Sequence, residues 1–305
     1  MNKKFQKIIL LFLLIITLTG CTKRFTVEDK EDNTKKAYVS NIICKPESED
    51  LLKIYTDNAK EQKIDIDNLP NCSELKINSG GYEGLWTSIF VKPLAWLIIK
   101  LGNLVKNYGI SIMIIGFLLR ALMFPISKKT NNMSKNMKKA QKDLENLERK
   151  YRGREDKEAM MMKSQEMLMI YKKYDISPFS GCLVALIQTP IFFAFLEAVY
   201  RVPAFFEETL WKFNLGATPL EGFKAGNYWY AILIILIGLA TYYSFKNIQT
   251  PISEEQQKQT KMMSTFMLVF IIIASFSLPT AIALYWIVSN GFTVLQNLIL
   301  KERKN

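Results

Sequence analysis

The apolar run from Tyr108 to Pro125, YGISIMIIGFLLRALMFP, contains one charged residue, Arg120. With about 1.5 Å of rise per residue, Arg120 lies about 18 Å along a helix from Tyr108 and about 8 Å from Pro125. We therefore expect it inside membrane hydrocarbon, where an arginine at a helix centre costs about 2.5 to 3.5 kcal/mol on insertion scales. Such a charge is usually retained because it faces protein or water, which predicts a wet cavity inside a helix bundle. The alternative is a side chain that snorkels to the nearer headgroups, because about 8 Å is within its reach.

The composition excludes several classes of protein. Of the 305 residues, 49% are apolar, and no histidine is present, which removes the commonest general base and metal ligand. The chain also lacks the Gly-rich phosphate-binding motifs, CxxC and HExxH. The net charge of +12 would suit nucleic acid or anionic lipid, and the charges flank apolar segments, which favours lipid. The sequence therefore predicts no enzyme, no cofactor, no metal site and no nucleic-acid partner.

The amino terminus has the pattern of a secretory signal. Basic residues precede a short apolar run, which ends in Leu18-Thr19-Gly20-Cys21. These four residues resemble the lipobox of bacterial lipoproteins, and the resemblance implies a signal peptide over residues 1–20 and a diacylglycerol thioether on Cys21. The alternative is an uncleaved anchor with an incidental cysteine. A lipid on Cys21 would place this residue at the outer leaflet and would leave the following residues outside.

Residues 21–84 are expected to form an extracytoplasmic tether or small module. From Thr22 to Gly84 there are 10 Lys/Arg and 13 Asp/Glu, and Leu51 to Lys63 could form a short helix. Cys44 and Cys72 are the thiols in this stretch, so a disulfide is possible in an extracytoplasmic setting.

The remainder predicts an all-α integral membrane protein with five transmembrane helices and a cytoplasmic helical hairpin. Residues 85–107 suit an interfacial amphipathic helix, because aromatic residues mix with two lysines and a proline; a further full span is the alternative. The five spans are expected at 108–127, 178–202, 228–245, 262–277 and 281–300. The segments between them are the hairpin at 128–177, an outer loop at 203–227, an inner loop at 246–261 and a cytoplasmic tail at 301–305.

Charge sets the orientation of these segments. Residues 128–175 carry 14 Lys/Arg against 8 Asp/Glu, which places them in the cytoplasm and agrees with an outer amino terminus. Apolar residues in this stretch recur at helical spacing, and a break at Tyr151 to Arg154 predicts two antiparallel helices. The apolar residues at this spacing are Met133, Met137, Leu144, Leu147, Met160, Met161, Met167, Leu168 and Tyr171. In the outer loop, we expect Phe205, Phe206, Trp211 and Phe213 to rest on the membrane interface.

With these segments in order, the chain resembles the Oxa/YidC/Alb family of membrane protein insertases, and in particular the lipoprotein-type members from Gram-positive bacteria. The matching residues are the Arg120 run, Ser177 to Cys182 leading to Leu186 to Pro190, then Leu284-Tyr285-Trp286 and Gln296. The resemblance implies a hydrophilic groove among the five helices, open to the cytoplasm and to lipid. It places Arg120, Gln188, Trp286 and Gln296 in that groove, with Thr189 and Asn290 as further polar candidates. For Gln188 alone, a hydrogen bond that only holds two helices together is the alternative.

The resemblance also implies a function and partners. The chain would insert, fold and assemble integral membrane proteins, and some lipoproteins, in the plasma membrane, alone or with the Sec translocon. Its partners would be nascent membrane protein segments, ribosome–nascent chain complexes and anionic lipids. Relatives with long basic tails use them on ribosomes, whereas the tail here is only Lys301 to Asn305. The alternative function is a small-solute transporter or channel with Arg120 in its polar pathway, against which the small number of spans argues.

Overall fold

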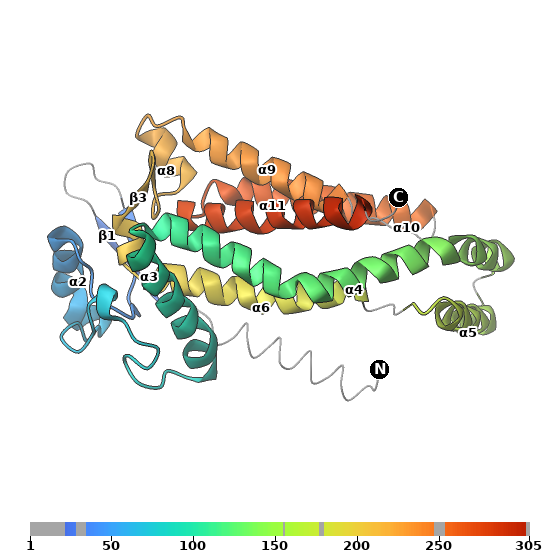
Figure 1. Ribbon diagram of the computed structural model, residues 1–305, viewed down its shortest axis with the longest axis horizontal. Helices are drawn as coiled ribbons and strands as arrows, with labels where there is room; N and C mark the ends of the chain where they lie inside the picture. Colours follow the sequence, from blue (N-terminus) through green and yellow to red (C-terminus); the bar gives the residue numbers. More distant parts are fainter. Residues whose placement is uncertain (1–21, 29–34, 155, 177–179, 247–253, 303–305) are drawn as a thin grey trace. The chain divides into compact units, whose positions relative to one another are not determined.

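A computed structural model of the chain describes residues 22–28, 35–154, 156–176, 180–246 and 254–302 (Figure 1). Cys21, the expected signal peptide and most of the carboxy-terminal tail lie outside these residues. The chain divides into two compact units. The first unit contains Met1–Ile115, Gln188–Tyr230 and Leu278–Tyr285, and the second contains Gly116–Ile187, Ala231–Ser277 and Trp286–Asn305.

The described chain is predominantly helical, as the sequence predicts. Its larger helices are α2 Glu49–Gln62, α3 Lys92–Val105, α4 Tyr108–Tyr151, α5 Lys157–Lys173, α6 Ser180–Arg201, α9 Tyr230–Lys246, α10 Glu254–Ser275 and α11 Thr280–Glu302. The shorter ones are η1 Cys72–Glu74, the π-helical η2 Thr87–Val91, α7 Ala204–Glu207 and α8 Pro219–Lys224. Two short antiparallel strand pairs, which were not predicted from the sequence, are also present: β1 Arg24–Glu28 with β2 Lys35–Val39, and β3 Thr209–Leu210 with β4 Phe213–Asn214.

In the first unit, the residues before η2 form a folded module with its own core. Strand β1 pairs with β2 in the register Arg24 to Val39, and α2 follows. The rings of Phe25 and Tyr55 pack edge to face at 5.8 Å, and Ile42 completes the buried cluster. The Tyr55 hydroxyl donates a hydrogen bond to the Val39 carbonyl at 2.9 Å, so the buried phenol is satisfied. Helix α2 includes most of the stretch from Leu51 to Lys63 that the sequence predicts to be helical.

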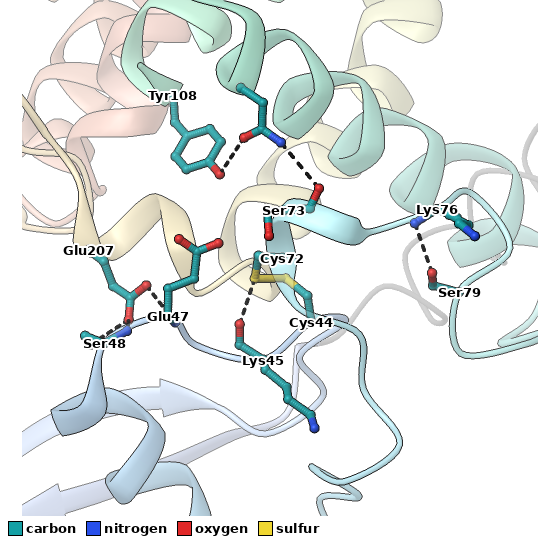
Figure 2. The surroundings of a disulfide bond; sticks show 11 residues. Cys44, Lys45, Glu47, Ser48, Cys72, Ser73, Lys76, Ser79, Tyr108 and Glu207 are labelled. Carbon is teal, nitrogen blue, oxygen red and sulfur yellow. Dashed lines mark hydrogen bonds between the residues drawn. A yellow bond between two sulfur atoms is a disulfide. The ribbon is translucent and has the colours of Figure 1, made fainter. Parts of the chain in front are cut away.

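A disulfide closes the loop that follows this core. Cys44 and Cys72 are both fully buried and are bonded, with 2.07 Å between their sulfur atoms (Figure 2). Beside them, Lys45 and Asn71 form an isolated parallel bridge, and the Lys45 amide donates to the Pro70 carbonyl at 2.8 Å. The bond therefore holds together two segments that are 28 residues apart in the sequence.

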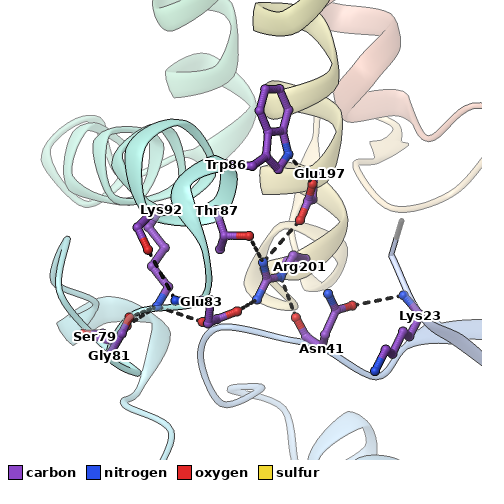
Figure 3. Close-up of polar contacts among 11 residues, drawn as sticks. Lys23, Asn41, Ser79, Gly81, Glu83, Trp86, Thr87, Lys92, Glu197 and Arg201 are labelled. Carbon is purple, nitrogen blue, oxygen red and sulfur yellow. Dashed lines mark hydrogen bonds and ion pairs between the residues drawn. The ribbon is translucent and has the colours of Figure 1, made fainter. Parts of the chain in front are cut away.

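An ionic cluster of three buried side chains, Arg201, Glu197 and Lys92, with the exposed Glu83 connects this module to α6 within the first unit (Figure 3). The Arg201 side chain is 2% exposed and contacts the carboxylates of Glu197 and Glu83. Lys92, also buried, lies 2.7 Å from Glu83. Burial alone raises the pKa of Glu83, but the Lys92 ammonium and the Arg201 guanidinium outweigh it and hold this pKa below its ordinary value. Because a lowered carboxyl pKa stabilises the folded state above the unfolded pKa, this contribution is lost as the pH falls through the acidic range.

Further contacts of the same cluster involve the neighbouring segments. Arg201 Nε donates to the Asn41 carbonyl at 2.6 Å, and Trp86 Nε1 donates to Glu197 at 2.8 Å. The Lys92 ammonium donates to the carbonyls of Ser79 and Gly81, each at 2.7 Å. Buried charges that are both paired and hydrogen-bonded in this way avoid the large cost of an isolated buried ion. The cluster therefore fixes residues 79–92 and the loop at Asn41 against the end of α6.

In residues 203–227, two aromatic residues do not lie where the sequence predicts. Phe205 and Phe213 are buried within the first unit rather than resting on a membrane surface, because Phe205 packs against Tyr108 at 5.3 Å and Phe213 against Tyr230 at 5.3 Å. Trp211 is 77% exposed. Before Trp211 in the sequence, the adjacent residues Glu207 and Glu208 accept hydrogen bonds from the backbone amides of Ser48 and Tyr108, at the starts of α2 and α4.

Helix α4, which belongs to the second unit from Gly116 onward, is one continuous helix. The sequence predicts two separate elements there: the span at 108–127 and the first helix of the hairpin. Helix α4 continues through Pro125 to Tyr151, and its later part forms the hairpin with α5 (Figure 1). Leu144, Leu147 and Tyr151 are buried between the two helices. The predicted break is observed, since α4 ends at Tyr151 and α5 begins after the Asp156 cap.

The apolar residues of α5 that recur at helical spacing do not all lie on the face that α4 covers. Met167 and Tyr171 pack against the hairpin core, but Met160, Met161 and Leu168 are between 55% and 61% exposed. The helix has many apolar residues on several sides, so helical spacing did not identify the single face that α4 covers. Met133 has a side chain that lies outside the described part of the chain.

Three of the described helices are long and apolar enough to cross a membrane by length and composition. They cover Thr87–Val105, Tyr108–Lys129 and Thr280–Leu300, and the apolar helices Tyr230–Lys246 and Lys261–Ser275 are shorter. The first lies within residues 85–107, the segment expected to be interfacial, and its length also suits the alternative of a full span.

We predict that replacing both Cys44 and Cys72 with serine destabilises the module. Because the disulfide closes a loop of 28 residues, the chain-entropy relation gives a loss of about 3.5 kcal/mol. Protease susceptibility of residues 35–84 in urea, with the protein in detergent, measures this loss. Cys182→Ser is the control, since it leaves the disulfide intact, and equal resistance of the double variant and the control would contradict the prediction.

We also predict that the hairpin depends on apolar packing more than on its surface ion pairs. Leu144 is buried, and its replacement by alanine should cost about 2 to 5 kcal/mol of local stability. Its neighbour Asp143 pairs with Lys173 at 2.8 Å on the surface, where such pairs contribute little. Amide hydrogen exchange of α5 should therefore accelerate strongly in Leu144→Ala and little in Asp143→Ala, and the reverse order would refute this account.

Candidate functional site

Arg120 is placed by α4 on the side of that helix that contacts α11 within the second unit. Its Nε donates a hydrogen bond to the hydroxyl of Ser289 at 2.7 Å, and Ser289 is buried. Three residues earlier on α4, the ring of Phe117 packs edge to face against Phe292 at 5.0 Å. Residues three apart share one side of a helix, so both contacts belong to the same face of α4 and the same face of α11. The half-buried Arg120 side chain is therefore directed at a neighbouring helix.

Further polar groups lie along α11. The indole of Trp286 donates to the hydroxyl of Thr241 on α9 at 3.0 Å, and Thr241 is fully buried. The Asn290 amide donates to the Trp286 carbonyl at 3.0 Å, and Thr293 Oγ1 donates to the Ser289 carbonyl at 3.1 Å. Trp286 thus connects α11 to α9, whereas Ser289 connects α11 to α4.

Gln296, the fourth predicted site residue, is also on α11 and is 6% exposed. It lies seven residues after Ser289, which is close to two helical turns, so both residues fall on one side of the helix. Arg120, Trp286 and Gln296 all belong to the second unit. Asn290, a further candidate, is also buried there.

Gln188 belongs to the first unit, where its hydrogen-bond partner is an aromatic residue. Its Nε2 donates to the Tyr285 hydroxyl at 3.0 Å, a contact between α6 and α11. The Tyr285 ring stacks on Phe195 of α6, with 4.1 Å between centroids. This geometry is that of a hydrogen bond that holds two helices together, which the sequence left open for this residue. The neighbouring Thr189 has an exposed side chain.

Ser289, Thr241 and Tyr285 were not among the predicted site residues. A signal for the first was present, because Ser289, Thr293 and Gln296 recur at helical spacing along an apolar helix. In α9, Thr241 and Ser244 are small hydroxyl residues among apolar and aromatic ones, and nothing in the sequence pairs Thr241 with Trp286. Its partnership with Trp286 depends on the packing of two helices that are distant in sequence.

The described residues present polar side chains around Arg120 and a separate hollow on the hairpin. They contain no group of three or more Cys, Asp or Glu side chains arranged to hold a metal ion. A hollow of about 520 Å³ lies on the hairpin between α4 and α5, away from Arg120, and is lined by Asp143, Leu147, Lys150, Glu166, Ile170 and Lys173. Around Arg120, the side chains supply hydrogen-bond donors, hydroxyls and one guanidinium among apolar helices. Such an arrangement suits the attraction of an acidic or polar segment.

The chain is similar to known proteins over most of its length. A family model described as "60Kd inner membrane protein" matches residues 100–305. The membrane protein insertase YidC of Oceanobacillus iheyensis is 31% identical over 226 residues, which are 72% of this chain and 85% of that protein. The membrane protein insertase MisCA of Bacillus subtilis is 32% identical over 217 residues, covering 71% of this chain and 79% of that protein.

A solved structure supports the fold. The crystal structure described as an active YidC insertase with the first transmembrane domain resolved matches with a TM-score of 0.51 at 24% sequence identity. The match covers 81% of this chain and 52% of the other, so the chain spans about half the length of that protein.

These relatives are named as insertases, which are not a class of enzymes, and none of those described here supports the alternative of a solute transporter. The family model covers more than half of the chain, including Arg120 and all of α11. This chain of apolar helices is a membrane protein, and it belongs to the Oxa/YidC family of membrane protein insertases.

Proposed function

We propose that this protein inserts membrane-spanning segments of newly made proteins into the plasma membrane and assists their folding and assembly. The observation that carries the proposal is the contact of Arg120 with Ser289 between apolar helices. A guanidinium directed at a neighbouring helix supports the wet cavity over a side chain that extends only to the headgroups. Family membership supports the class of activity.

The proposed mechanism lowers the barrier that a polar flank meets on crossing hydrocarbon. A groove among five transmembrane helices, open to the cytoplasm and closed outside, would shorten the apolar distance to be crossed. Arg120 would attract acidic residues of the flank, because charges are poorly screened inside a helix bundle. Gln188, Trp286 and Gln296 would supply the polar lining. The apolar segment would then move along α9 and α11 into lipid, where its burial is favourable.

The proposed topology follows from lipid and charge. Cys21 would carry the lipid at the outer leaflet, the module at residues 21–84 would lie outside, and the hairpin and carboxy terminus would lie in the cytoplasm. Two positively charged regions would face the inner leaflet: the hairpin, with lysines near the bilayer, and the tail. These would bind anionic headgroups, which attract basic segments by about 1 kcal/mol per residue.

The proposed partners are nascent membrane proteins, some lipoproteins among them, and the protein would act alone or beside the Sec translocon. Ribosome–nascent chain complexes would deliver the substrates.

We predict that Arg120→Ala impairs the insertion of single-span substrates with acidic flanks by about tenfold, which corresponds to about 1.4 kcal/mol of lost attraction. Arg120→Lys should retain most of the activity if charge matters more than the guanidinium fork. The measurement is protease protection of the substrate in cells depleted of their own insertase.

Ser289→Ala is the matched control for the two Arg120 variants. It removes the hydroxyl that Arg120 contacts but keeps the charge, so its effect should be much smaller than that of Arg120→Ala. Full insertion of acidic substrates by Arg120→Ala would refute the attraction mechanism, whereas equal defects in both variants would show that the hydrogen bond, rather than the charge, is required.

We further predict that Cys21→Ala prevents lipid attachment. Mass spectrometry of the purified protein should show a diacylglyceryl addition on a mature amino-terminal cysteine, and the variant should lack it. An unmodified Cys21 within an uncleaved chain would contradict the lipoprotein assignment.

A further inference from the structure

The tip of the β3–β4 hairpin carries an exposed tryptophan in a backbone conformation that favours glycine. Leu210 pairs with Phe213, so Trp211 and Lys212 form a two-residue turn. Trp211 has a φ of 61°, and its side chain is 77% exposed. The first position of such a turn is usually glycine, because a Cβ there is disfavoured by sterics. Neither the backbone nor burial within this chain accounts for tryptophan at this position.

Other aromatic residues gather beside it. The ring of Trp211 lies 6.1 Å from that of Trp229, and the Lys212 ammonium lies 4.2 Å from the centroid of Trp229. Tyr228 is 75% exposed and Trp229 is 45% exposed. These four residues, Trp211, Lys212, Tyr228 and Trp229, are called the aromatic tip.

The aromatic tip has a firm base. Asn227 donates to the Lys212 carbonyl at 2.9 Å and accepts from the Trp229 amide at 3.2 Å, which fastens the turn to the segment before α9. Below it, the buried Phe213 ring packs on Tyr230, whose hydroxyl accepts from the Asn214 amide at 3.0 Å. The fold therefore holds exposed rings in a defined place instead of burying them.

The chemistry of the aromatic tip matches a lipid headgroup layer. Trp229 directly precedes α9, which starts at Tyr230 and is the expected third span, so it lies where the chain enters the membrane. Tryptophan and tyrosine are enriched at this depth because their rings are amphipathic, and a lysine beside them attracts anionic headgroups. We propose that the aromatic tip inserts into the outer leaflet and binds an anionic lipid surface. This rests on the topology given under the proposed function.

The depth of Trp211 tests the proposal. The full-length protein is reconstituted into vesicles of phosphatidylcholine and phosphatidylglycerol, and the Trp211 signal is the fluorescence that Trp211→Phe loses. Lipids brominated near the headgroup should quench this signal about twice as strongly as lipids brominated deep in the acyl chain, since the interface is the preferred depth of tryptophan. Iodide in the water should quench it weakly. Strong iodide quenching without bromine quenching would overturn the proposal and leave a protein partner as the occupant.

Two variants distinguish a loss of lipid binding from a loss of folding and from a loss of insertion activity. Trp211→Gly suits the backbone, so its melting temperature in detergent should equal or exceed that of the unaltered protein, while the stabilisation gained on transfer into the vesicles should fall. An undiminished gain would contradict lipid binding. Arg120→Ala should leave the Trp211 quenching profile unchanged, because the depth measurement needs no substrate; failure of insertion and failure of the lipid contact are thus distinguishable.

Discussion

The guanidinium of Arg120 sets the central constraint on this protein, because a charge among apolar helices is costly unless its lost hydration is replaced. The hydroxyl of Ser289 replaces part of it through a hydrogen bond to Nε. That contact requires α4 and α11 to present matching faces, which the Phe117 and Phe292 rings reinforce. Trp286 then connects α11 to Thr241 of α9. Hydrogen bonds between side chains thus connect α4 to α11 and α11 to α9 in the second unit.

A second arginine shows how differently a buried charge is used elsewhere. Arg201 is 2% exposed and is held by Glu197, Glu83 and the Asn41 carbonyl. With Lys92 and the disulfide, it holds the module formed by the residues before η2 in place within the first unit. Two carboxylates neutralise the charge of Arg201, so this residue has a structural role. Arg120 is half-buried on an apolar helix, and for this reason it is the better candidate for contact with substrates.

The sequence predicted the helices well because membrane-spanning segments follow from apolar runs and from the sign of the flanking charges. It predicted Arg120 as a site residue because a lone charge in such a run is conspicuous. It did not predict Thr241 as the partner of Trp286, or Tyr285 as that of Gln188, since these pairs depend on how distant helices pack. The burial of Phe205 and Phe213 was missed for a similar reason: local composition does not distinguish aromatic residues that pack on protein from those that pack on lipid.

The central claim is that the charge of Arg120 selects the acidic flanks of substrates, and a charge exchange tests it most directly. The insertion of two single-span substrates, identical except for acidic or basic flanks, is compared between the unaltered protein and Arg120→Glu. The account predicts that the unaltered protein favours the acidic flank and that Arg120→Glu favours the basic one. The same order of preference in both proteins would contradict it.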